Sequence, residues 1–231
     1  MEKNEVSKFY DEYVAQQIAK GYNERHLLLN DLMLKMGLQD SSSILELGCG
    51  IGTITSLLSK VVTRGKFVSV DISKDSIEHA RKVNRNTNIE FIVSELLGFD
   101  YPGTQFDYVV LFDVLEHVPV EQHAAIFKVI SGLMHEHSKL VIHVPSREII
   151  RYNEKNCPEL MQIIDQPLSE IKMIQDATDA GLRLEEFRFT NIWELHDYEL
   201  FIFVKQFEFD KSKKTVAAKK SLFGKLKNKL K

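Results

Sequence analysis

Three glycines and a carboxylate stand where a nucleotide would be bound. Gly48, Gly50 and Gly52 directly follow the apolar run Ile44–Leu47, and Asp71 closes the next β-rich run, roughly 20 residues further on. Glycine permits the backbone torsions of a tight turn and lets the main chain approach a ligand closely. A carboxylate accepts hydrogen bonds, and both hydroxyls of a ribose donate them. The pattern therefore predicts a nucleotide-type site formed by this loop and Asp71.

Two histidines stand near the ends of later apolar runs. His117 follows the run 106–112, and His143 lies within the run 140–144. Because imidazole titrates near neutral pH, each is a candidate general base. Each also has a structural interpretation. His117 would then hydrogen-bond the loop before Pro119, and His143 would be a core histidine with a backbone partner.

The elements that must position these residues alternate between strands and helices. Apolar and β-branched runs predict strands at 44–47, 66–70, 89–93, 106–112, 140–144, 183–190 and 198–205. Helical spacing of apolar residues predicts helices over 5–36 (broken at Gly21), 53–62, 73–84, 120–135 and 168–180. This order predicts an α/β fold: a doubly wound, mostly parallel seven-stranded sheet with helices on both faces. In such sheets ligands bind beyond the carboxyl ends of the strands, where the glycines and Asp71 fall.

Composition places the chain among globular proteins of a reducing compartment. No apolar run approaches the ~20 residues that a membrane span needs, and the first five residues lack the apolar core of a signal peptide. The two cysteines, Cys49 and Cys157, form no disulfide framework. We therefore expect a cytoplasmic protein.

Charge is distributed unevenly along the chain. Residues 211–231 hold nine lysines and no acid, which leaves 21 basic and 33 acidic side chains in residues 1–210. The acidic body makes nucleic acid an unlikely partner. In the tail, Leu222, Phe223, Leu226 and Leu230 form one helical stripe among the lysines. Residues 209–231 are thus expected to form a basic amphipathic helix that binds an anionic membrane surface, peripherally at its inner face. A disordered solubilising tail and an RNA contact are the alternatives.

Four motifs in order carry a resemblance to class I (Rossmann-like) S-adenosylmethionine-dependent methyltransferases. Residues 44–52 resemble the family's first motif, which departs from the dinucleotide pattern G-x-G-x-x-G. Residues 68–73 and 91–96 resemble the second and third, with Glu95 where the family usually has Asp. Residues 106–118 resemble the fourth. Together they divide the chain into an N-terminal helical lid (1–40), a methyltransferase domain (41–208) and the basic tail (209–231).

The resemblance implies S-adenosylmethionine as the cofactor and a role for each matching residue. The glycines would approach the methionine part, Glu46 its amino group, and Asp113 would line the same end. Asp71 would bind the ribose, Ile72 would pack on the adenine, and Glu95 would accept from the adenine amino group. The full cofactor-binding set is Glu46, Gly48, Cys49, Gly50, Gly52, Asp71, Ile72, Ser94, Glu95, Leu96 and Asp113.

The resemblance also frames the reaction. The departing sulfur becomes neutral, so the protein needs only to align the acceptor and to remove the proton of a hydroxyl. We expect O-methylation of a small molecule, or of a glycan or lipid-linked precursor, with His117 or His143 as the base. N- or C-methylation of a small metabolite and a non-catalytic cofactor-binding scaffold are the alternatives.

A metal is not expected, although one stretch is suggestive. Asp113, Glu116 and His117 are similar to the acidic-x-x-Glu-His stretch of ubiquinone-biosynthesis O-methyltransferases, some of whose relatives bind a divalent ion there. Two carboxylates and an imidazole are ligand types for Mg²⁺ or Zn²⁺.

Candidate acceptor contacts come from two segments outside the predicted sheet. In the N-terminal lid they are Tyr10, Tyr22, Arg25 and His26. The stretch 145–168 is long for a connection and lacks clear periodicity, which favours a functional loop with Arg147, Arg151 and Tyr152 as contacts. Trp193 and His196, between the last two strands, are further candidates to face the pocket.

Overall fold

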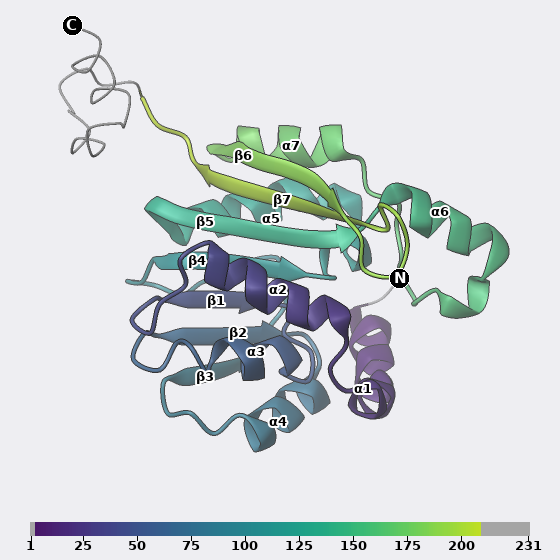
Figure 1. Ribbon diagram of the computed structural model, residues 1–231, viewed down its shortest axis with the longest axis horizontal. Helices are drawn as coiled ribbons and strands as arrows, with labels where there is room; N and C mark the ends of the chain where they lie inside the picture. The colour runs from purple at the N-terminus through teal and green to yellow at the C-terminus, as the bar shows by residue number, and fades with distance from the viewer. Residues whose placement is uncertain (1–2, 209–231) are drawn as a thin grey trace, which may run out of the picture.

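The computed structural model describes residues 3–208, so the predicted tail helix lies outside the described residues. Figure 1 shows one twisted sheet with helices on both sides. Its strands are β1 (Ile44–Leu47), β2 (Phe67–Asp71), β3 (Ile89–Val93), β4 (Phe106–Phe112), β5 (Met134–Pro145), β6 (Leu182–Thr190) and β7 (Tyr198–Lys205). They are ordered β3-β2-β1-β4-β5-β7-β6, and β7 runs antiparallel to both its neighbours. The predicted mostly parallel seven-stranded sheet is confirmed.

The described residues form seven α-helices. They are α1 (Lys3–Lys20), α2 (Glu24–Lys35), α3 (Thr53–Leu58), α4 (Lys74–Val83), α5 (Val120–Gly132), α6 (Arg147–Asn156) and α7 (Glu170–Asp179). Two short 3-10 helices, η1 (Leu115–His117) and η2 (Pro158–Leu160), lie in the connections. None of the helices in residues 3–208 is long and apolar enough to cross a membrane.

The sheet buries a separate hydrophobic cluster on each face. One cluster joins β1, β4 and β7 to α2 and α3, with Leu29 and Leu58 fully buried. The other joins the sheet to α5 and α7, with Phe127 and Ala177 fully buried. Because alternate residues of a strand point to opposite faces, the nearly continuous apolar sequence of β4 serves both clusters.

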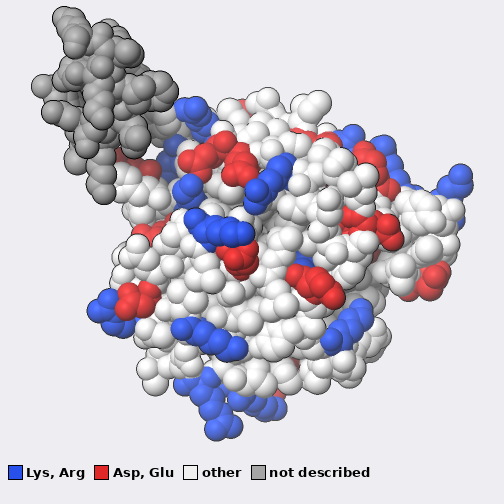
Figure 2. Space-filling view, viewed as in Figure 1, with Lys and Arg blue, Asp and Glu red and all other residues white. Residues whose placement is uncertain are grey.

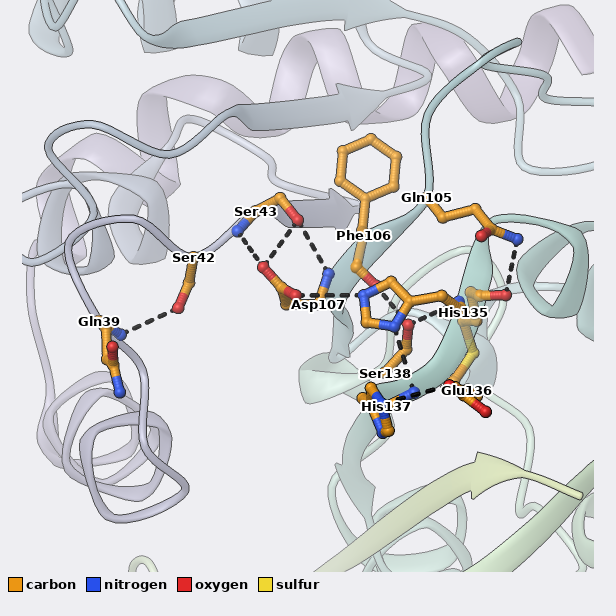
Figure 3. A network of polar contacts seen from close by, with 11 residues as sticks. Gln39, Ser42, Ser43, Gln105, Phe106, Asp107, His135, Glu136, His137 and Ser138 are labelled. Carbon is orange, nitrogen blue, oxygen red and sulfur yellow. Dashed lines mark hydrogen bonds and ion pairs between the residues drawn. The ribbon is translucent and has the colours of Figure 1, made fainter. Parts of the chain in front are cut away.

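The amino ends of β1, β4 and β5 are joined by a polar network, shown in Figure 3. Asp107 accepts hydrogen bonds from the backbone N–H and the hydroxyl of Ser43, at 2.7 and 2.9 Å, and pairs with His135 at 3.1 Å. Ser138 donates to the carbonyl oxygen of Phe106 at 2.6 Å. The network satisfies backbone groups where the β4–β5 register shifts between Phe106 and Tyr108, at the end of the sheet opposite the glycines.

Several boundaries differ from the sequence-based expectation. The predicted helix 53–62 ends at Leu58. The predicted helix 120–135 ends at Gly132, and β5 begins at Met134, well before residue 140, because Met134 pairs with Phe106 of β4. The stretch 145–168, expected to be an irregular loop, contains α6 and η2. Ile150 is the only buried residue of α6, and Ile149 and Ile150 are its only aliphatic residues, too few for an apolar repeat to be recognised in the sequence.

Candidate active site

A cavity of about 470 Å³ opens at the carboxyl ends of β1 to β4. The loops after these strands form one wall, and residues of α1 and α2 form another; Figure 1 shows α1 lying beyond this edge of the sheet. Most of the cofactor-binding residues expected from the sequence line it: Glu46, Gly48, Cys49, Gly50, Asp71, Ile72, Ser94, Glu95, Leu96 and Asp113. A cavity of this size suits a cofactor with part of a second ligand.

The glycine loop turns sharply where β1 ends. The N–H groups of Gly48 and Cys49 both donate to the carbonyl oxygen of Val70, at 2.8 and 3.0 Å. Gly48 has a φ of +78°, and a Cβ there would lie 2.4 Å from Cγ2 of Val114. Gly52 does not line the cavity; it precedes α3 and packs against α4, where a Cβ would lie 2.9 Å from that of Ala80. The loop thus has no room for side chains at either position.

Two buried carboxyl groups flank this loop. Glu46 accepts hydrogen bonds from the hydroxyls of Thr55 and Ser69, at 2.5 and 3.0 Å. Burial raises its pKa to about 7 despite these bonds. Asp71 accepts from the N–H of Gly50 at 2.7 Å and of Ser73 at 2.9 Å, and burial likewise raises its pKa. The two oxygens of Asp71 have about four acceptor positions, and the backbone N–H groups of Gly50, Ile72 and Ser73 leave at least one of them for a ligand.

Asp113 occupies a strained position directly after β4. Its φ is +56°, a value that is uncommon for residues other than glycine and is often found at functional sites. Its carboxylate forms an ion pair with Arg25 of α2 at 3.0 Å. Arg25 also lies 3.4 Å from His26, and burial together with this guanidinium lowers the pKa of His26 to about 4. The lid residues Arg25 and His26, both expected contacts, line the cavity.

His117 lines the same cavity and is held by a distant segment. Its Nδ1 lies 2.9 Å from a carboxylate oxygen of Asp165 and 2.7 Å from the carbonyl oxygen of Ile164. Its Nε2 lies 3.7 Å from the buried carboxyl of Glu116. Burial alone would lower the pKa of His117, but Glu116 and Asp165 raise it to about 9. Burial also raises the pKa of Glu116, to about 8.

His143 lies in a different environment. It is fully buried, its ring stacks on Tyr198 at 4.7 Å between centroids, and its Nε2 lies 2.9 Å from the hydroxyl of Thr190. It is not among the residues that line the cavity. The geometry therefore favours a structural role for His143 and leaves His117 as the better-placed base.

His143 is expected to make the protein less stable in mild acid. Burial, then the nearby Arg25 and Arg188, lower its pKa to about 3. The unfolded chain takes up a proton near pH 6.5 that the folded chain excludes. The contribution of His143 to the free energy of unfolding is therefore fully present above pH 6.5 and decreases as the pH falls. The expected decrease between pH 7.5 and pH 5 is about 2 kcal/mol.

Urea denaturation at both pH values, with wild type and His143→Phe, measures this effect. The phenylalanine keeps an aromatic ring against Tyr198 but does not titrate. The variant should lose this part of the pH dependence. The same change in unfolding free energy for both proteins would contradict a buried, neutral His143.

Other expected contacts divide between the cavity and the surface. Tyr10 of α1 and Trp193 line the cavity. Tyr22, Arg147, Tyr152 and His196 are not among the lining residues. Tyr22 hydrogen-bonds the hydroxyl of Ser56, Arg147 pairs with Glu170, Tyr152 is 58% exposed, and His196 stacks on Phe189. Arg151, on α6, is exposed.

Several residues of the site carried no signal in the sequence. Gln162, Ile164 and Tyr198 line the cavity, and Asp165 pairs with His117. Asp11 of α1 accepts a hydrogen bond from the hydroxyl of Ser73 at 2.5 Å, which ties α1 to the start of α4. All of these contacts join distant parts of the chain. In residues 3–208, no group of three His, Cys, Asp or Glu side chains is arranged to hold a metal ion.

Comparison with known proteins finds methyltransferases among the relatives of this chain. Trans-aconitate 2-methyltransferase of Azoarcus sp. is 26% identical over 130 residues, which cover 56% of this chain and 49% of the relative. Demethylmenaquinone methyltransferase of Staphylococcus aureus is 27% identical over 130 residues, covering 52% and 54%. The chain thus spans about half the length of these curated relatives.

Solved structures share the fold. Magnesium protoporphyrin IX methyltransferase from Synechocystis, solved with S-adenosylhomocysteine, gives a TM-score of 0.63 at 16% identity, over 79% of this chain and 82% of that one. A protein from Pyrococcus horikoshii gives 0.66 at 21% identity, over 79% and 90%. A family model described as a methyltransferase domain matches residues 38–203. Because residues 38–203 are well over half of this 231-residue chain, the chain belongs to the family of S-adenosylmethionine-dependent methyltransferase domains.

Proposed function

We propose that this protein transfers a methyl group from S-adenosylmethionine to a hydroxyl of a small molecule, or of a glycan or lipid-linked precursor, with His117 as the base. One observation carries the proposal: the same cavity is lined by the glycine loop, by Asp71 and by His117. Cofactor and acceptor would therefore meet beside an imidazole. The curated relatives named above carry small-molecule acceptors in their names, which supports a small acceptor for this chain.

The residues of the cavity fit the cofactor. The close approach of Gly48 to Val114 leaves backbone rather than side chain facing the methionine part. Glu46 is buried with a pKa near 7, so a bound ammonium group would favour its charged form. Asp71 has an acceptor position left for a ribose hydroxyl, and Ile72 and Glu95 line the wall assigned to the adenine. When bound, the cofactor supplies an electrophilic methyl group on a sulfonium.

The acceptor would enter between α1, α2 and the loop before β7. Tyr10 and Trp193 give this part of the cavity aromatic surface. Nη1 of Arg25 is buried and lacks a hydrogen-bond partner among the described residues, which leaves a donor for an acceptor oxygen. On the face seen in Figure 2, basic and acidic side chains of the described residues are interspersed, which argues against nucleic acid as the acceptor.

A labelled-methyl transfer screen tests the proposal. Purified protein is incubated with radiolabelled S-adenosylmethionine and matched sets of alcohols, phenols, glycans, amines and quinone precursors, with and without lipid vesicles. Transfer to hydroxyls supports the proposal. Transfer only to nitrogen or carbon supports the alternative chemistry. Cofactor binding without transfer in any set supports the non-catalytic scaffold.

Asp71→Ala is expected to weaken cofactor binding by roughly 10- to 100-fold. The change removes hydrogen bonds to the ribose and the bond that holds the Gly50 N–H at 2.7 Å; two such bonds contribute roughly 1.5–3 kcal/mol. Calorimetric titration with S-adenosylhomocysteine measures the affinity. Asp100→Ala, which removes an exposed carboxylate from the loop after β3, is the control and should bind like wild type. Equal affinities for all three proteins would remove Asp71 from the site.

The tail gives a separate expectation that rests on the sequence alone. Residues 211–231 carry nine lysines and one apolar stripe, and each lysine near an anionic surface contributes about 1 kcal/mol at best. In a liposome flotation assay, we expect the full chain to be recovered with vesicles rich in phosphatidylglycerol. A chain ending at residue 210 should remain in the unbound fraction. Zwitterionic vesicles are the control. Equal recovery of the two chains with anionic vesicles would refute membrane binding through the tail.

A further inference from the structure

The carboxylate of Asp165 joins two parts of the cavity wall. One oxygen lies 2.9 Å from Nδ1 of His117, and the other accepts a hydrogen bond from the backbone N–H of Gln162 at 2.7 Å. Both partners line the cavity. The side chains of His117 and Asp165 are only 11% and 9% exposed. A single buried carboxylate therefore fixes the imidazole and a neighbouring stretch of backbone together.

The surrounding segment is fastened to η1 by further bonds. The backbone N–H of Gln166 donates to the carbonyl oxygen of Glu116 at 3.0 Å, and its side-chain amide donates to that of Val118 at 2.8 Å. The carbonyl oxygen of Ile164 also lies 2.7 Å from Nδ1 of His117. Residues 162–166 thus reach across from the stretch before α7 and hold the 3-10 helix that carries His117.

These contacts define which nitrogen of His117 is basic. A carbonyl oxygen and a carboxylate both face Nδ1, and each can only accept a hydrogen bond. Nδ1 must therefore carry a proton, and in the neutral ring Nε2 is left with the free lone pair. The ring is also prevented from rotating, so the lone pair keeps one direction.

We propose that Asp165 is the positioning residue of the methyl-transfer site, holding His117 in the Nδ1–H form so that Nε2 takes the proton of the acceptor hydroxyl. The proposal rests on the proposed function, in which His117 is the base. In the step, a bond would form between the acceptor oxygen and the methyl carbon as the bond from that carbon to the sulfonium sulfur breaks, and the sulfur would leave as a neutral thioether. The hydroxyl proton would pass to Nε2, and the carboxylate of Asp165 would stabilise the imidazolium.

The charged and titratable groups around His117 come from several elements. Glu116 on the same 3-10 helix, Asp165, and Asp113 after β4 act on it directly, and the ring of Tyr10 on α1 lies 6.1 Å away between centroids. Arg25 on α2 and Tyr198 on β7 act on Asp113 in turn. Burial opposes the charge on the imidazole, while Glu116 and Asp165 favour it. Removing the charge of Asp165 while keeping its shape should therefore lower the pKa of His117, by roughly 1–3 pH units.

NMR of protein labelled with ¹⁵N and ¹³C in histidine, saturated with S-adenosylhomocysteine, tests the proposal. In wild type we expect the neutral ring of His117 to be protonated at Nδ1. In Asp165→Asn the pKa of His117 should fall while the Nδ1–H form persists, because the carbonyl oxygen of Ile164 still faces Nδ1 and can only accept a hydrogen bond. Asp179→Asn, at an exposed carboxylate of α7 that bonds Gln175, is the matched control and should titrate like wild type.

The outcomes separate the two proposals. If the neutral ring of His117 in the wild-type protein were protonated at Nε2, the positioning role would be overturned. This measurement requires only the wild-type protein. An unchanged His117 pKa in folded Asp165→Asn would overturn it as well. If these NMR results are as expected, Asp165→Asn should also move the rise of kcat to lower pH and lower its plateau at high pH, because the imidazole is then a weaker base, with little change in KM. Full turnover by His117→Gln would instead remove the base from the proposed function, and the NMR result would still stand.

Discussion

Replacing His117 with glutamine is expected to lower kcat/KM for methyl transfer by about 10²–10⁴-fold, the usual contribution of a general base. The affinity for S-adenosylhomocysteine should change little, because the expected cofactor contacts come from the glycine loop and Asp71 instead. Glutamine keeps a polar side chain of similar reach but cannot take up a proton near neutral pH. The loss should therefore fall on the chemical step.

The pH dependence gives this prediction its sharpest test. A base must be unprotonated to act, and burial opposed by Glu116 and Asp165 gives His117 a pKa of about 9. In wild type, kcat/KM should rise with pH until about 9 and then level off. The rise should be absent in His117→Gln. Activity that falls over this range in wild type would contradict a basic His117.

The measurement uses the best acceptor from the labelled-methyl screen. His137→Gln is the control, because the side chain of His137 is 82% exposed and lies near the amino ends of the strands, away from the cavity. It should match wild type in both rate and pH profile. Wild-type turnover in His117→Gln at every pH would exclude His117 as the base.

The part of the site that could be predicted from the sequence depends on local pattern. The run Ile44–Leu47 is apolar because the strand is buried on both faces. The strand ends in a sharp turn with positive φ values at Gly48, Gly50 and Gly52, which residues other than glycine rarely adopt. Asp71 falls at the end of the next parallel strand, so the chain direction alone brings it to the same edge. Such features need no knowledge of distant contacts.

Contacts between distant segments could not be predicted. Asp165 reaches His117 from 48 residues away, out of a segment with no apolar period. The two candidate bases illustrate a second limit. Both His117 and His143 were expected near strand ends, but the sequence does not say which way each side chain points. The pleat of β5 turns His143 onto Tyr198, inside the protein.

Gly48→Ala is expected to damage both stability and activity, and the chain contains a matched glycine that isolates the cause. An alanine at the φ of +78° costs about 1–2 kcal/mol in any surroundings. Gly98 has a φ of +80°, but nothing lies within 4 Å of its Cβ position. Gly98→Ala should therefore show the backbone cost alone, measured as the loss in unfolding free energy.

At Gly48 an additional steric cost is expected. The added Cβ would lie 2.4 Å from Cγ2 of Val114, whereas carbon atoms in contact are separated by about 3.5–4 Å. Relief of this overlap requires the loop to move by roughly 1 Å, and a displacement of that size at a reacting centre costs about 100-fold in rate. Gly48→Ala should therefore lose more stability than Gly98→Ala and most of its kcat/KM.

Val114→Ala removes the clashing methyl groups and completes the test. In a double-mutant cycle, Gly48→Ala combined with Val114→Ala should recover the steric part of the loss but not the backbone part, so the two changes should couple favourably. Unfolding free energies and affinities for S-adenosylhomocysteine of the four proteins give the coupling. If the losses were additive, contact with the side chain of Val114 would not be the reason that Gly48→Ala is unfavourable. The loop would then relieve the overlap by moving instead.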